Sequence, residues 1–119
     1  MDGDWLAAGA HVNAVGAFEP TTRELRANVV SKAAIVVDSR EEAAKAAGDL
    51  LLAIEDGALL PDAHFVELGE LLAGTTALSQ DGTEITLFES LGLAVEDVAA
   101  AAYVVAAARE KGLGVEVAL

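Results

Sequence analysis

The sequence predicts an α/β fold, in which a small sheet of parallel strands alternates with helices and a long C-terminal helix follows. Three observations indicate this class. The β-branched run Ala34–Asp38 is apolar on both faces, which is typical of a buried parallel strand. Segments whose apolar residues recur at helical spacing separate it from the other predicted strands. Residues 93–111 are alanine-rich, with acids in the first turn and bases in the last, as a helix dipole prefers.

Length and composition limit the function. At 119 residues the chain is expected to be one domain, residues 1–119. Its net charge of −13 argues against nucleic acid and acidic membranes as partners, and fits either a salty cytoplasm or an ordinary acidic protein. The acidic N-terminus and the short apolar run 98–108 predict a cytoplasmic, soluble protein. Without cysteine and with only His11 and His64, no metal site is expected.

The first third of the chain predicts one strand and one helix. Residues 10–17 form a short apolar run with its exit loop, which predicts a strand. Residues 21–33 place Leu25, Val29 and Val30 at helical spacing, which predicts a helix leading into the next strand.

The middle of the chain predicts two helices. Ser39 is positioned as an N-cap and Glu42 completes a capping box, so one helix is expected from Ser39 through Ile54. Pro61 then opens a shorter helix that is expected to end at Gly74.

The last third predicts a strand at Glu84–Ser90, the long helix at 93–111 and a short final strand at residues 114–118. Three or four strands are fewer than a doubly wound sheet normally has. No G-x-G-x-x-G phosphate loop occurs in the sequence, although the first strand of such a sheet usually leads into one. The chain therefore corresponds to the second half of such a sheet.

Five segments in order resemble one enzyme family: GAHVNAVGAFEPTTREL, VVDS, AGDLLLAIEDG, ELGELLAG and ITLFESLGLAVEDVAAA. From Trp5 to about Gly112 the chain resembles the C-terminal third of the ornithine cyclodeaminase/mu-crystallin family. The resemblance implies a partial, second-half Rossmann-like parallel sheet from a domain that binds NAD or NADP. Full family chains also carry an N-terminal substrate and dimerisation domain. Members include cyclodeaminases, an alanine dehydrogenase and reductases of cyclic imino acids, all using hydride transfer with the nicotinamide.

The resemblance also implies a set of contact residues. Two segments are involved, the loop after the first predicted strand and the start of the loop after Glu89. The cofactor contacts would be made by Val15, Gly16, Ala17, Phe18 and Ser90, and the substrate contact by Leu91.

Two of the matched positions depart from the cyclodeaminase pattern. Cyclodeaminases carry their acid/base aspartate where this chain has Phe18, and a cofactor-contacting lysine where it has Thr22. A phenylalanine cannot transfer a proton, and the adjacent Glu19 need not point the same way. Imine reduction or dehydrogenase chemistry is therefore the expected family activity, rather than cyclodeamination.

Each candidate also has a structural interpretation. Gly16 can end a strand in a tight turn or let a ligand approach the backbone, and Asn13 can form a turn or lie near the nicotinamide. Asp38 can organise the turn before a capped helix or belong to the ligand edge of the sheet. Ser90 and Gly92 can cap the long helix or expose its N-terminal amides to a ligand.

Three functional hypotheses follow. The first is a truncated relative of an NAD(P)-dependent imino-acid reductase or amino-acid deaminase that is inactive alone. The second is a non-enzymatic association module, and the third is the C-terminal chain of a split enzyme completed by an N-terminal chain. The expected consequences are weak cofactor binding, a homo-oligomer built on Leu93–Ala108, and loops Gly16–Phe18 and Ser90–Gly92 facing each other with Phe18 at the gap.

Overall fold

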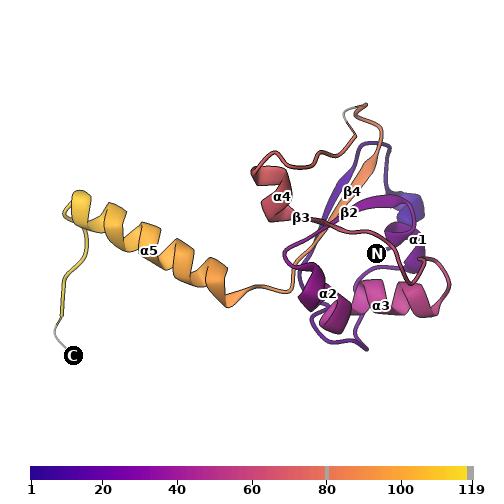
Figure 1. Ribbon diagram of the computed structural model, residues 1–119, viewed down its shortest axis with the longest axis horizontal. Coiled ribbons are helices and arrows are strands. Elements are labelled where there is room, and N and C mark those ends of the chain that lie inside the picture. Colours follow the sequence, from indigo (N-terminus) through magenta and orange to yellow (C-terminus); the bar gives the residue numbers. More distant parts are fainter. Residues whose placement is uncertain (80, 118–119) are drawn as a thin grey trace.

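A sheet of four strands organises the fold, with every neighbouring pair parallel and the strands in the order β1-β4-β2-β3 (Figure 1). The computed structural model describes residues 1–79 and 81–117. The strands are β1 (His11–Ala14), β2 (Ala33–Val37), β3 (Val66–Glu67) and β4 (Ile85–Glu89). The helices are the 3-10 turn η1 (Gly3–Trp5), α1 (Ala27–Val30), α2 (Arg40–Ala46), α3 (Gly48–Glu55), α4 (Leu68–Leu72) and α5 (Ala94–Glu110). The α/β class with a long C-terminal helix is confirmed.

One face of the sheet carries the hydrophobic core. Val12, Leu87 and Ile35 lie side by side in register on β1, β4 and β2, and all three are at most 7% exposed. Val29 of α1 and Leu50 of α3 belong to the same buried cluster. Each aliphatic side chain buried in this way contributes about 1.5–3 kcal/mol relative to an exposed one. The short helices are therefore stabilised chiefly by packing on the sheet.

The opposite face of the sheet is less completely covered. His11, Thr86 and Phe88 lie there with Leu68 and Leu71 of α4, around a shallow cavity of about 350 Å³. The His11 ring bonds to Thr86 Oγ1 through Nδ1, at 2.7 Å, so its polar atoms serve the sheet surface.

Helix α5 leaves the rest of the fold (Figure 1). None of its 17 residues is buried, and it helps give the molecule a longest dimension of 54 Å. Its exposed side chains include Val98, Tyr103 and Val104. Within the described residues, no helix combines the length and apolar character that crossing a membrane would require.

Predictions from strong local patterns agree closely with the structure. The strands expected at Ala34–Asp38 and Glu84–Ser90 are β2 and β4, and the helix expected at 93–111 is α5. The prediction of a final strand at 114–118 is wrong for residues 114–117, which pair with no strand among the described residues. Position 118 lies outside the described residues.

The helix predicted for residues 21–33 is wrong in its first half, because tertiary contacts occupy the backbone. Only Ala27–Val30 is helical. The amides of Glu24 and Leu25 donate to Asp49 Oδ1, at 2.9 and 2.8 Å. The Arg26 amide donates to the Met1 carbonyl, at 2.9 Å.

The continuous helix predicted from Ser39 to Ile54 is divided into α2 and α3. Ser39 caps α2 as expected, accepting from the Glu42 amide at 3.3 Å. The break follows from Gly48, whose amide donates to the Ala17 carbonyl at 3.0 Å instead of continuing α2.

The helix predicted from Pro61 to Gly74 is only Leu68–Leu72. Val66 and Glu67 before it form the short strand β3, which pairs with Val36 and Val37 of β2. The strand was not predicted because two residues carry no recognisable alternation.

Candidate functional site

The carboxyl ends of all four strands lie along one edge of the sheet. Ala14 of β1 is in register with Glu89 of β4, and Glu89 is in register with Val37 of β2. The loops that follow these strands are therefore neighbours, and the Ser90 amide donates to the Ala14 carbonyl at 2.9 Å. Ligands of parallel α/β sheets bind at this edge.

Asp38 fixes the loop after β4. Its Oδ2 accepts from the amides of Leu91 and Gly92, at 2.7 and 2.8 Å, and from Ser90 Oγ at 3.3 Å. Its Oδ1 accepts from the Ser39 amide, at 2.8 Å. Asp38 does organise the turn before α2, as one interpretation held, but it also binds a loop that is distant in sequence. Its Oδ2 occupies the amide N–H groups that Leu91 and Gly92 would otherwise offer to an anion.

Glu24 fixes the loop after β1. Its Oε2 accepts from the amides of Gly16 and Val15, at 2.6 and 3.2 Å. A Cβ at position 16 would lie 2.6 Å from the Glu24 carboxyl group. Gly16 thus permits a close approach, but the group that approaches is a side chain of the same chain. Pattern reasoning missed Glu24 because nothing local connects it to the loop.

The remaining predicted residues divide between core and surface. Ala17 is 1% exposed and anchors the loop to α3 through its carbonyl. Val15 and Phe18 are 66% and 61% exposed. Leu91 packs against the core cluster. Asn13 lies on the open sheet face, with Oδ1 bonded to the His11 ring at 3.1 Å.

A cavity of about 420 Å³ lies between the two loops and α2. Phe18 lines it from one side, and residues 91–94 line it from the other. The remaining lining residues, Glu42 and Ala46, belong to α2. The two loops, far apart in sequence, therefore meet as expected, with Phe18 at the gap. The side chains that line the cavity are apolar except for the Glu42 carboxylate.

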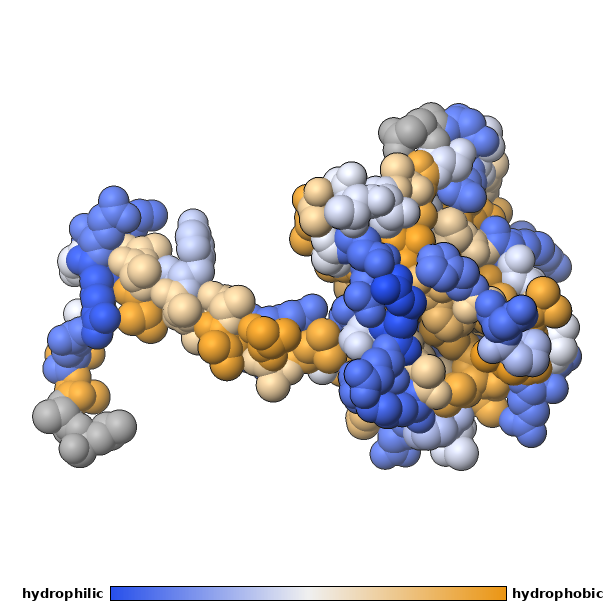
Figure 2. All heavy atoms as spheres, viewed as in Figure 1, coloured by the Kyte–Doolittle hydropathy of each residue, from blue (hydrophilic) through white to orange (hydrophobic). Residues whose placement is uncertain are grey.

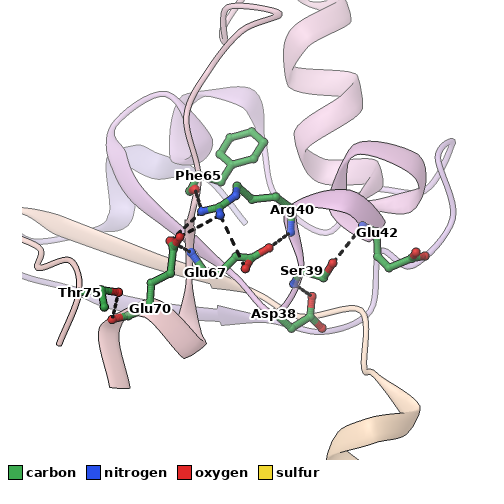
Figure 3. Close-up of polar contacts among 8 residues, drawn as sticks. All are labelled: Asp38, Ser39, Arg40, Glu42, Phe65, Glu67, Glu70 and Thr75. Carbon is green, nitrogen blue, oxygen red and sulfur yellow. Dashed lines mark hydrogen bonds and ion pairs between the residues drawn. The ribbon is translucent and has the colours of Figure 1, made fainter. Parts of the chain in front are cut away.

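An ion-pair cluster holds the β2 and β3 end of the same edge (Figure 3). Arg40 donates through both terminal nitrogens to the two Glu70 oxygens, at 2.7 and 2.8 Å. Its backbone amide donates to Glu67 Oε1, at 2.8 Å. The Arg40 guanidinium lowers the pKa of Glu70 to about 2, with the Glu67 amide adding to the effect. This cluster joins the start of α2 to α4 and is structural.

These residues fit one end of a nicotinamide cofactor better than its phosphates. The cavity beside Phe18, whose lining side chains are apolar apart from Glu42, can receive a flat ring. The nearby amides of Gly16 and Gly92 already donate to carboxylates, and a carboxylate-rich edge disfavours phosphate. In the described part of the chain, no group of His, Cys, Asp and Glu is arranged to hold a metal ion.

The parallel sheet, with its loops at the carboxyl edge, places the chain in the Rossmann-like fold class. Solved structures of that class support the assignment. The chain belongs to the ornithine cyclodeaminase/mu-crystallin family, which matches residues 1–112. Recognition of the family from sequence is confirmed, and the match is to the C-terminal portion of its relatives.

Individual relatives show the same partial coverage. The chain is 42% identical to Delta(1)-pyrroline-2-carboxylate reductase of Bacillus cereus, over 92% of this chain and 34% of that protein. It resembles the Thermococcus litoralis reductase of the same name, which was solved with NADH and L-proline. The TM-score is 0.86 and the identity 36%, over 98% of this chain and 36% of that one. An archaeal alanine dehydrogenase dimer with bound NAD gives a TM-score of 0.79 and 35% identity, over 100% of this chain and 37% of that one. The chain thus spans about a third of the length of these relatives.

Proposed function

We propose that this chain is the C-terminal part of an NAD(P)-dependent imino-acid reductase, and that it forms the nicotinamide side of the cofactor site without being active alone. The observation that carries the proposal is one cavity at the carboxyl edge of the sheet, lined by Phe18 from the loop after β1 and by residues 91–94 from the loop after β4. The similarity to reductases solved with NADH supports the same assignment.

The other half of the site would come from polypeptide outside these 119 residues. No G-x-G-x-x-G segment occurs in the sequence to bind the pyrophosphate. Among the described strands, β1 lies at the edge of the sheet, so its outer side could pair with a further strand. A complementing N-terminal segment, in the same or a separate chain, would supply both. The cofactor itself would accept or donate the hydride at the nicotinamide.

Phe18 favours reduction over cyclodeamination in this proposal. It lines the cavity at the position where cyclodeaminases are expected to carry an acid/base carboxylate. Within the cavity lining, the only ionisable side chain is Glu42, which Lys45 engages at 3.0 Å. The residues here would therefore position a ring and exclude water, and would leave proton delivery to another segment.

Cofactor titration and complementation together test the proposal. Calorimetry with the chain alone should find NADH binding weaker than roughly millimolar, because the pyrophosphate contacts are missing. Adding the separately produced N-terminal two-thirds of the Bacillus cereus reductase should restore NADH oxidation with 1-pyrroline-2-carboxylate. Micromolar NADH binding by the chain alone would contradict the half-site proposal, as would a correctly folded mixture without activity.

A second candidate function is self-association without catalysis. It is favoured by α5, along which apolar residues are exposed (Figure 2). A helix of this kind in water needs a partner to cover it. In this candidate two or more copies pair through α5, and the cavity at the sheet edge has no ligand.

A further inference from the structure

Glu89 occupies an unusual place for an acid. It ends β4 on the core face of the sheet, in register with Ala14 and Val37, and its side chain is 0% exposed. Among the described residues, neither of its carboxyl oxygens has a hydrogen-bond partner. An ionised carboxylate in such a position carries a large desolvation penalty.

A second buried carboxyl lies beside it, at the start of α3. Asp49 is 1% exposed, and its Oδ1 accepts from the amides of Glu24 and Leu25. Its Oδ2, like the Glu89 oxygens, lacks a partner within the described residues. Two like charges at such a site cannot both be held in the interior without compensation. One of the two is therefore neutral in the closed fold.

The groups around the two carboxyls favour Glu89, rather than Asp49, as the protonated and neutral one. Burial raises the pKa of Glu89 to about 8, and the carboxylates of Asp49, Glu24 and Asp38 act in the same direction. They face it from α3, from the segment before α1 and from the loop after β2. Burial also raises the pKa of Asp49, but its two amide donors oppose this effect and stabilise its charge. Arg23, which attracts Asp49, is already paired with Asp56 at 2.8 Å.

The same contacts connect Glu89 to the loop after β1. Asp49 binds the amides of residues 24 and 25, and the Glu24 carboxylate in turn binds the amides of Val15 and Gly16. Next to Asp49, the Gly48 amide binds the Ala17 carbonyl. The start of α3 thus holds Val15–Phe18 in place from two directions. Leu50, also at this start, belongs to the same buried cluster as Ala14 and Val37, the two residues in register with Glu89.

We propose that Glu89 is a pH-dependent switch for the Val15–Phe18 loop: as a neutral acid it lets the start of α3 close over the end of β4, and loss of its proton to solvent releases the loop. Ionisation places a second negative charge beside Asp49, and the charge is relieved only if water reaches Glu89. Opening at the start of α3 admits that water and disrupts the contacts of Glu24 and Ala17. The switch requires no cofactor, so it holds whether or not the proposed function does.

Amide hydrogen exchange at Val15 and Gly16 tests the switch. After correction for intrinsic rates, the opening equilibrium should rise about tenfold per pH unit between about pH 6 and pH 8 in the wild-type chain, because the open form binds one proton fewer. Glu89→Gln keeps the shape without the charge, so its opening equilibrium should not change over this range. Glu110→Gln alters an exposed glutamate on α5 and should behave like the wild type.

The proposal is wrong if Glu89→Gln shows the same pH-dependent opening as the wild type, or if the wild type shows none. A carbon-13 titration of the wild-type Glu89 carboxyl keeps the test decisive even if Glu89→Gln does not fold. A titration midpoint near pH 8, at the pH where the opening equilibrium of the loop stops rising, supports the switch. A midpoint near the ordinary value of 4.5 contradicts it.

Discussion

At the scale of single residues, Asp38 and Gly48 position the candidate site without lining its cavity. Asp38 receives four donors from two loops, and Gly48 lies against the backbone of the segment after Phe18. Both positions can be tested with matched controls elsewhere in the chain.

Asp38→Asn should destabilise the fold by about 1–3 kcal/mol, because its amide nitrogen cannot accept the hydrogen bonds that both carboxylate oxygens now accept. The loss should appear in urea unfolding, and exchange at the Gly92 amide should accelerate most. Asp97→Asn, on exposed α5, is the control and should change stability by less than about 0.5 kcal/mol. Equal effects of the two substitutions would show that Asp38 does not fix the Ser90–Gly92 loop.

Gly48→Ala should be strongly destabilising. The added Cβ would overlap the carbonyl oxygens of Glu19 and Thr22, which are backbone atoms that cannot move aside cheaply. A cost of at least about 2 kcal/mol is expected. Gly69→Ala is the matched control, since its Cβ would meet nothing within 4 Å inside α4, and it should be neutral or slightly stabilising. Comparable unfolding midpoints for both variants would refute the packing described for Gly48.

At the scale of elements, α5 stands apart from the sheet and its helices. Because none of its residues is buried, a chain ending at Leu93 should retain the unfolding free energy of the remaining fold, within about 0.5 kcal/mol. The same truncation should abolish self-association, measured by light scattering at low and high salt. A full-length chain that stays monomeric under both conditions would rule out association through α5.

Local signals explain which elements the sequence predicted. β2 has a continuous β-branched run and α5 has a long uninterrupted helical segment, so both were located closely. The side-chain cap at Ser39 located the start of α2 but not its end. β3 exists because Val66 and Glu67 pair with β2, and the break before Gly48 exists because Ala17 binds its amide. Neither cause is visible within its own segment.

The same contrast between local signals and tertiary contacts applies to the candidate site. The edge where the loops meet was predictable, because loops after parallel strands gather at one side of a sheet. The resemblance to a family supplied the roles of the residues. The sequence does not indicate the roles of Glu24 and Glu89, because only the fold shows which amides and carboxyl groups these two acids approach.

At the scale of the whole molecule, acidity determines how stability depends on pH. Glu89 has a raised pKa of about 8 in the fold, so its contribution is fully present below about pH 4.5 and is lost as the pH rises toward 8. Glu70 has a lowered pKa of about 2, so its contribution is present above about pH 4.5 and is lost as the pH falls toward 2. The thermal midpoint should therefore be highest near pH 4–5, roughly where the net charge also approaches zero.

Thermal scans between about pH 3 and pH 9 check this expectation. Glu89→Gln should flatten the decline above pH 5, and Glu70→Gln should flatten the decline below it. A wild-type midpoint that rises steadily from pH 5 to pH 8 would contradict the buried, neutral state of Glu89.

We propose that the two loops at the carboxyl edge form the nicotinamide side of a cofactor site. The most direct measurement is an NMR titration of the isolated chain with nicotinamide mononucleotide, carried past roughly millimolar concentration because only half of the site is present. Saturable chemical-shift changes are expected at the amides of Gly16–Phe18 and Ser90–Gly92. Shifts that concentrate instead at the separate cavity beside Pro61–Phe65, or their absence throughout the titration, would contradict it.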